Sequence, residues 1–214
     1  MFKPTLIIFT LLFSVSIFAF SIDPKNENYC ENCFLKNYSQ NKVTTIDKLN
    51  FSILSEDESI KLFNYLKSFT EIPFRYVKDG CYARSYVLGW AMKQMGLKSN
   101  KIFSIGFLDA KNRYKQVAPV IHWGYHVANV VAVQNKQDQI EYKVIDISLF
   151  DSPVSIEKWK SAQLQTKKSK IKKVLIRPLN NYRFTDVKYN NRPKREKGDL
   201  KNAWGFLRSF KKQL

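Results

Sequence analysis

Two segments with the pattern of strands, joined by a short polar loop, constrain the fold more than any other feature of the sequence. Residues 121–133 are dense in β-branched side chains, which favours a strand over a helix. Residues 140–147 are predicted to form a second strand, and the loop of residues 134–139 between the two segments is short and polar. We therefore predict an antiparallel hairpin whose turn is centred near Lys136.

Two helical patterns come before this hairpin. Ser55 followed by Glu58 matches a capping box, and apolar residues then recur at helical spacing, so we predict a helix over residues 56–68. A second helix is predicted over residues 81–97, because aromatic side chains recur there at helical spacing and Gly96 is a stop signal.

Further strands are predicted at residues 103–107, where apolar residues alternate, and at residues 174–176. Residues 165–173 are rich in lysine and are predicted to form a solvated loop. Helices that precede a run of antiparallel strands are typical of the α+β class. We therefore predict one α+β domain over residues 51–180.

Cys81 is the first candidate for chemistry, because it follows an Asp79–Gly80 turn and opens the second predicted helix. A thiol at a helix N-terminus lies at the positive end of the helix dipole, beside unpaired backbone N–H groups, and both favour the nucleophilic thiolate. The same N–H groups can hold a developing oxyanion. A buried structural cysteine is the alternative interpretation.

The chain has only two histidines, His122 and His126. They are four residues apart, so both fall on one face of the predicted strand. No acidic residue lies between them and the segment has the pattern of a strand, so we predict no metal site and no cofactor. His126 is the preferred general base, whereas His122 is interpreted as a structural or surface residue.

Asp146 lies in an apolar run, where an unpaired carboxylate would be costly. A hairpin centred near Lys136 sets Asp146 directly opposite His126 on the same face, with Cβ atoms ~5 Å apart. A carboxylate in that position fixes the imidazole tautomer and stabilises imidazolium. A one-residue slip of the register would separate the two side chains, and an aspartate that caps a turn at the strand end is the alternative.

Cys81, His126 and Asp146 together follow the papain-type order, with the nucleophile on a helix and the base on a sheet. A thiolate would attack an amide carbonyl, and the histidine would protonate the leaving group and then activate water. Deamidation, transglutamination and peptide cleavage all fit this triad. A non-catalytic basic binding protein is the remaining alternative.

Three segments resemble motifs of the bacterial protein-glutaminases. Residues 72–84 resemble the nucleophile motif, residues 123–128 the histidine motif and residues 145–150 the aspartate motif. Ile147 stands where the family pattern leads us to expect proline. The resemblance extends from about Asn50 to about Trp159, and the three motifs occur in the family's order.

The resemblance implies a papain-like or transglutaminase-like fold, with N-terminal helices packed on an antiparallel sheet. It also implies that Cys81 is the nucleophile, His126 the base and Asp146 the residue that orients the base. The implied reaction converts accessible glutamine side chains of proteins or peptides to glutamate and ammonia.

Four residues beside these motifs are weaker candidates for substrate binding: Tyr82, Arg84, Trp123 and Tyr125. Arg84 lies one helical turn from Cys81 and would favour the thiolate, but a solvated helix face is the interpretation that we prefer. Trp123 and Tyr125 can line a glutamine cleft, although aromatic residues in strands usually belong to a core.

The N-terminus has the pattern of a secretory signal. Lys3 precedes an apolar run from Leu6 to Phe20, and small residues follow at the positions that a signal peptidase reads. We predict a signal peptide over residues 1–21 and a secreted or periplasmic protein. The run is short for a spanning helix, and a membrane anchor is the alternative.

Residues 22–50 are polar and are predicted to be a linker or a short pro-segment. Within them Cys30 and Cys33 form a Cys-x-x-Cys pair that can oxidise to a disulfide after export. Cys81 would then be the single free thiol.

The net charge of +18 is concentrated in the last quarter of the chain, because residues 160–214 hold 17 Lys or Arg and three Asp or Glu. We interpret residues 181–214 as a basic C-terminal extension with an amphipathic helix after Asp199. Such a helix can bind an anionic membrane surface or an acidic protein, and a helix docked on the domain is the alternative. We expect a monomer with no specific nucleic-acid partner.

Overall fold

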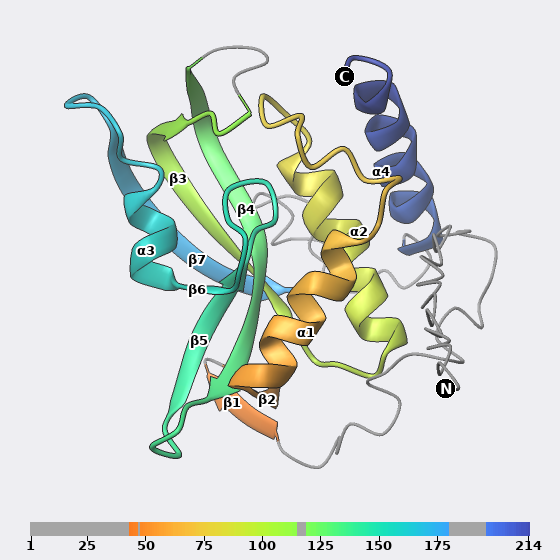
Figure 1. Cartoon of the computed structure of the whole chain (residues 1–214), viewed down its shortest axis with the longest axis vertical. Helices are drawn as coiled ribbons and strands as arrows, with labels where there is room; N and C mark the ends of the chain where they lie inside the picture. The colour runs from red at the N-terminus through yellow and green to blue at the C-terminus, as the bar shows by residue number, and fades with distance from the viewer. Residues whose placement is uncertain (1–42, 47, 115–118, 180–195) are drawn as a thin grey trace, which may run out of the picture.

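The structure, a computed structural model, describes residues 43–46, 48–114, 119–179 and 196–214 (Figure 1). The predicted signal peptide, Cys30 and Cys33 lie outside the described residues. The elements in chain order are β1 (Val43–Ile46), β2 (Leu49–Ser55), α1 (Glu56–Lys67), α2 (Cys81–Gln94), β3 (Asn100–Lys111), β4 (Val120–Gln134), β5 (Ile140–Ile145), β6 (Val154–Ser155), α3 (Ile156–Ser161), β7 (Lys170–Pro178) and α4 (Glu196–Lys211). The predicted α+β class is confirmed.

A seven-stranded sheet forms one layer, in the order β1-β2-β4-β3-β7, and off this path β5 pairs with β4 and β6 pairs with β5. The helices α1, α2 and α4 cover one face of this sheet, whereas the short α3 lies on the other (Figure 1). Neighbouring strands are antiparallel except for β2, which runs parallel to β4. The long strand β4 is the centre of the sheet, and it carries both histidines.

The first predicted helix forms with the predicted cap. The Ser55 hydroxyl accepts a hydrogen bond from the Glu58 backbone N–H at 3.2 Å, and the Glu58 carboxylate accepts one from the Ser55 N–H at 2.7 Å. Leu62, Phe63 and Leu66 then bury the inner face of α1 against the core.

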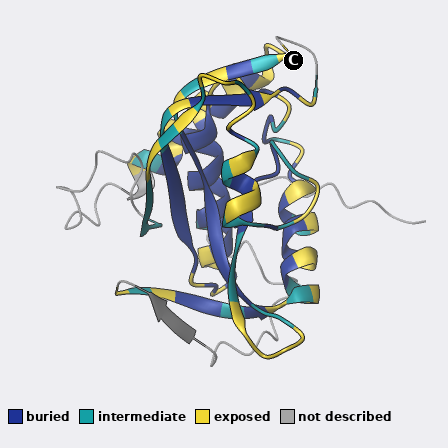
Figure 2. Ribbon diagram, turned by 90° about the vertical axis from the view of Figure 1, so that its left-hand side faces the viewer, coloured by how far each residue is buried: buried dark blue, intermediate teal, exposed yellow. Residues whose placement is uncertain are grey.

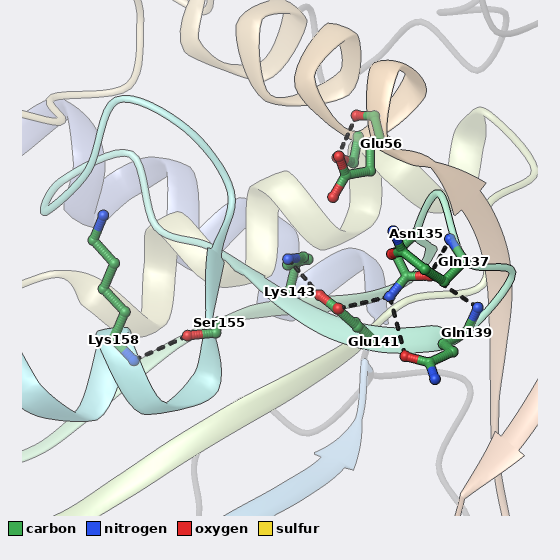
Figure 3. Close-up of polar contacts among 9 residues, drawn as sticks. Glu56, Asn135, Gln137, Gln139, Glu141, Lys143, Ser155 and Lys158 are labelled. Atoms are coloured by element: carbon green, nitrogen blue, oxygen red, sulfur yellow. Dashed lines mark hydrogen bonds and ion pairs between the residues drawn. The ribbon is translucent and has the colours of Figure 1, made fainter.

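The β4–β5 hairpin is present, but its turn is centred on Gln137 rather than on Lys136. The side chain of Asn135 organises this turn (Figure 3). Its Oδ1 accepts hydrogen bonds from the backbone N–H groups of Gln137 and Gln139, and its Nδ2 donates to Glu141. The predicted centre was therefore wrong by one residue, because a side chain closes the turn.

Long stretches of the central strands are buried (Figure 2), and apolar side chains form one cluster on each face of the sheet. On the helical face, apolar residues of α1, α2 and α4 pack on Val127, Val131 and Val133 of β4. On the opposite face, Trp159 of α3 packs in a smaller cluster with Phe51. The alternation of the β4 side chains between these two clusters is what fixes the strand's register.

The helix α4 packs within the domain. Its apolar stripe of Leu200, Ala203, Trp204 and Leu207 is buried in the same cluster as α2. The boundary predicted at residue 180 therefore does not separate this helix from the core. Its apolar face is occupied by α2, as in the docked-helix alternative.

Strands also occur in two segments that were predicted to lack them. The strands β1 and β2 begin inside the predicted linker, at Val43 and Leu49, and β7 begins at Lys170 in the predicted lysine-rich loop. Each gains its hydrogen bonds from a partner strand, β2 from β4 and β7 from β3, which composition alone does not reveal. Among the described residues, no helix is long and apolar enough to cross a membrane.

Candidate active site

Cys81 is the first residue of α2, so its thiol lies at the N-terminal end of a 14-residue helix. Gly80 before it has a φ of 83°, which glycine adopts without strain, and a Cβ there would lie 2.7 Å from Phe210 of α4. The first backbone bond of the helix runs from the Arg84 N–H to the Gly80 carbonyl. The N–H groups before it have no partner within the helix and can serve a substrate oxygen. The thiol is free and buried.

His126 projects from the middle of β4, and Asp146 lies just after β5. The His126 Nε2 and the Asp146 Oδ2 are 2.7 Å apart, and both side chains are at most 5% exposed. The β4–β5 turn is centred one residue later than predicted, which moves the cross-strand partner of each residue by two positions. Side chains two positions apart lie on the same face of a strand, so His126 and Asp146 still share a face. They meet as diagonal neighbours instead of directly opposed ones.

The carboxylate of Asp146 sets the charge of this pair. Burial alone lowers the pKa of His126, but the charge and hydrogen bond of Asp146, with a contribution from Cys81, raise that pKa to about 9. Burial raises the pKa of Asp146, whereas His126 and a 3.0 Å bond from the Trp159 indole N–H lower it below its ordinary value. At neutral pH the pair is therefore imidazolium and carboxylate.

The second imidazole nitrogen, Nδ1 of His126, forms no well-directed hydrogen bond within the described part of the chain. The Cys81 thiol is nevertheless close enough to raise the pKa of His126. This nitrogen is thus the one available to exchange a proton with the thiol, because Nε2 is committed to Asp146.

Two tryptophans hold the imidazole ring in place. Trp123 stacks on His126, with ring centroids 4.4 Å apart and planes at 8°, and its indole N–H donates to the Lys78 carbonyl at 3.2 Å. Trp159 stacks more obliquely, with centroids 5.7 Å apart. Sequence reasoning did not single out Trp159. The available signal was a tryptophan in an otherwise charged short helix, which indicates a buried anchor.

Arg84 is buried, with 4% of the residue exposed, so the predicted solvated helix face is wrong. Its Nη1 donates to the Tyr76 carbonyl at 2.7 Å, and its Nη2 has no partner among the described residues. Burial lowers the pKa of this guanidinium, while the negative charges of Cys81 and Asp146 raise it. The buried cation therefore supports negative charge at both residues.

A narrow cavity of about 10 Å³, the size of a single water position, connects these groups. Cys81, Arg84, His126 and Asp146 line it, together with the polar side chains of Ser85, Asn129 and Ser148. The sequence-predicted triad and Arg84 thus converge on one small polar space.

The other candidates lie elsewhere. The ring of Tyr82 contacts Phe206 of α4 edge-on, at 5.6 Å between centroids, and Tyr125 packs partly buried against the main core. His122 has a 75% exposed side chain, and its Nδ1 lies 2.5 Å from Asp109. No cluster of potential metal ligands occurs in the described ranges.

Comparisons with known proteins agree with each other. A family model described as glutaminase matches residues 59–163, a range that contains Cys81, His126 and Asp146. A crystal structure of protein-glutaminase is 28% identical, with a TM-score of 0.54, over 61% of this chain and 75% of that chain. The NMR structure of protein-glutaminase from Chryseobacterium proteolyticum is also 28% identical, with a TM-score of 0.54, over 61% and 76%.

A crystal structure of pro-protein-glutaminase is 27% identical, with a TM-score of 0.55, and the match covers 67% of this chain. This chain spans only 54% of that pro-form. A search of curated proteins finds no match.

The match of residues 59–163 to the glutaminase family model first indicates the class of protein that this chain resembles. The solved structures narrow the class, since those described above are protein-glutaminases. Together they support assignment of the chain to the protein-glutaminase family, as the three sequence motifs imply.

Proposed function

We propose that this protein hydrolyses the side-chain amide of glutamine in proteins or peptides, giving glutamate and ammonia, with Cys81 as nucleophile. The single observation that carries the proposal is the buried 2.7 Å contact between His126 and Asp146 beside a free thiol at a helix N-terminus. The similarity to protein-glutaminases supports the choice of a glutamine amide over other amides.

In the first half-reaction, the Cys81 thiolate attacks the carbon of the glutamine carboxamide. The carbonyl oxygen becomes an oxyanion, which the N-terminal backbone N–H groups of α2 are placed to stabilise. The His126 imidazolium gives its proton to the departing nitrogen, the C–N bond breaks and ammonia leaves. A thioester between the substrate and Cys81 remains.

In the second half-reaction, neutral His126 takes a proton from water as the water oxygen attacks the thioester carbon. The C–S bond breaks, and the products are the Cys81 thiolate, His126 imidazolium and a carboxylic acid, which loses its proton to bulk water and becomes the glutamate side chain. Asp146 keeps the ring oriented and stabilises its charged form throughout, consistent with the raised pKa of His126.

Intact-mass analysis of a glutamine-rich protein such as casein tests this proposal. We expect each modified site to gain the mass of an NH₂-to-OH exchange with no chain cleavage, and ammonia to appear in equal amount. Both Cys81→Ser and His126→Ala should abolish the change. New fragments would instead indicate a peptidase, and incorporation of an added primary amine would indicate a transglutaminase.

We also propose that the protein is exported. Lys3 and the apolar run from Leu6 to Phe20 support this localisation. N-terminal sequencing of the mature protein from a bacterial host that exports it should find a first residue near position 22. An uncleaved Met1 in the cytoplasmic fraction would contradict the proposal.

A further inference from the structure

A second concave surface, of about 920 Å³, lies beside the candidate active site and is not used by the proposed chemistry. Phe107 and Leu108 of β3, His122 and Trp123 of β4, and Lys167 and Lys168 from the segment before β7 line it. We call this surface the groove. The segment that brings the lysines is held to β3, because Asp109 exchanges backbone hydrogen bonds with Gln163 and Gln165.

The floor of the groove is apolar and exposed. Phe107 is 64% exposed, the highest value among the large hydrophobic residues described, and it stands at the bulge between β3 and β7. Lys172 lies over its ring, with Nζ 4.9 Å from the ring centroid. A large exposed aromatic residue with a cation above it favours a ligand that combines an apolar group with negative charge.

The segment that supplies the rim of the groove is positively charged. Lys167 and Lys168 line the groove and Lys172 lies over Phe107, whereas Lys170 and Lys173 belong to the same segment. Five lysines occur between positions 167 and 173, a stretch without any acidic residue; they are Lys167, Lys168, Lys170, Lys172 and Lys173. All five are exposed, and none forms an ion pair within the part of the chain that the structure describes. We call them the lysine cluster.

The one acidic side chain lining the groove is already occupied. Asp109 accepts hydrogen bonds from Thr166 and from Ser169, the latter at 2.9 Å, and lies 2.5 Å from His122. These bonds lower the pKa of Asp109, and its side chain is only 10% exposed. The charge offered to a ligand is therefore that of the lysines.

Trp123 connects the groove with the candidate active site. Its indole lines the groove and also stacks at 4.4 Å on the imidazole of His126. An extended chain advances ~3.3 Å per residue, so residues that flank a glutamine bound at Cys81 can extend past Trp123 and over the groove. The groove is thus continuous with the surface that a protein substrate must cover.

Resting on the proposed function, we infer that the groove is the docking surface for the substrate chain beside the target glutamine, and that it selects segments with acidic and apolar side chains. The occupant is a polypeptide and not a free polyanion. The apolar floor around Phe107 suits a ligand with apolar side chains, and the continuity with the candidate active site through Trp123 suits a chain that also carries the glutamine. Charge complementarity with the lysine cluster sets its preferred sign.

The test uses the full mature chain and two fluorescent peptides with one central glutamine. In both, a phenylalanine lies three residues from the glutamine, and the remaining flanks are aspartate in one peptide and lysine in the other. Binding is measured by anisotropy with Cys81→Ala, so that it does not depend on turnover. Ammonia release is measured with the wild-type thiol, and a blocked glutaminyl dipeptide, too short to reach the groove, serves as the reference substrate.

Two charge-reversal variants separate the groove from general electrostatics. Lys167→Glu with Lys168→Glu alters the rim, whereas Lys61→Glu with Lys136→Glu makes the same change in net charge on α1 and in the β4–β5 turn. We expect the Lys167→Glu and Lys168→Glu variant to weaken binding of the aspartate peptide by about tenfold, because two attractive contacts are lost and two repulsive ones replace them. The Lys61→Glu and Lys136→Glu variant should change the affinity for the same peptide by about twofold or less. Phe107→Ala should weaken binding of both peptides.

Wild-type preference for the aspartate peptide, lost only in the rim variant, supports the inference. Equal binding of the two peptides, equal effects of the two charge-reversal pairs, or full displacement by polyphosphate at matched charge would each overturn it. Failure of the proposed function is recognised separately, as absence of ammonia from the dipeptide and both peptides while the binding preference persists.

Discussion

Replacing Asp146 with asparagine isolates the effect of one buried charge on the candidate base. Asparagine has the same shape and can still accept the indole hydrogen bond of Trp159. It removes the negative charge that outweighs the burial of His126. We expect the pKa of His126 to fall from about 9 to below the ordinary 6.5, because burial then dominates.

The size of the effect follows from the wild-type shift. The pKa of His126 lies about 2.5 units above 6.5, which corresponds to about 3 kcal/mol of folding stability. The pKa is raised in the folded state, so this stabilisation is complete below pH 6.5 and is lost as the pH rises through 9. In Asp146→Asn the sign reverses, and the buried imidazole opposes folding as the pH falls below 6.5.

NMR titration of the imidazole protons is the direct assay, since the chain has only two histidines and a His122→Gln variant assigns their signals. Urea unfolding on both sides of the pH 6.5 to 9 window gives the matching free energies. A His126 signal in Asp146→Asn that still titrates above pH 7 would refute the reasoning. It would mean that the Cys81 thiolate, and not the carboxylate, holds the proton on the ring.

Four further outcomes follow from the structure. Cys81→Ser should lower deamidation about a thousandfold or more without changing the thermal midpoint, and loss of the fold would point to a structural role for the thiol. Arg84→Gln should lower the free energy of unfolding in urea by about 3 kcal/mol and should lower the alkylation rate of Cys81, and Arg84→Lys should give intermediate values. An unchanged alkylation rate would show that the charge of Arg84 does not act on the thiol. Gly80→Ala should destabilise by ~1–2 kcal/mol and reduce activity, because its φ is 83° and Phe210 blocks the added methyl. Leu207→Ala should lower the free energy of unfolding by ~2–5 kcal/mol. A change near zero, as at a surface position, would show that α4 is not part of the core.

The sequence was sufficient to predict that His126 and Asp146 lie together, because the face of a strand depends only on parity. The predicted turn centre was wrong, yet His126 and Asp146 still meet, since the error moved the partner by two residues. Arg84 was misjudged for the opposite reason. A charged residue on a helix is usually solvated, and only the packing of α4 and the sheet around α2 shows that this one is buried. The parallel pairing of β2 with β4 likewise depends on long-range contacts that no local pattern contains.

The burial of α2 explains why the C-terminal helix α4 belongs to the same folded unit as the candidate active site. Eleven of its 14 residues are buried, including Cys81 and Arg84, so the helix has no solvated face along most of its length. A helix of that kind must be covered on all sides. The sheet covers one side, and α4 covers another through Trp204 and Leu207, while Phe210 packs against Gly80. The helix α4 therefore shields from water the turn that presents the thiol, so its apolar side chains are part of the core that supports the candidate active site.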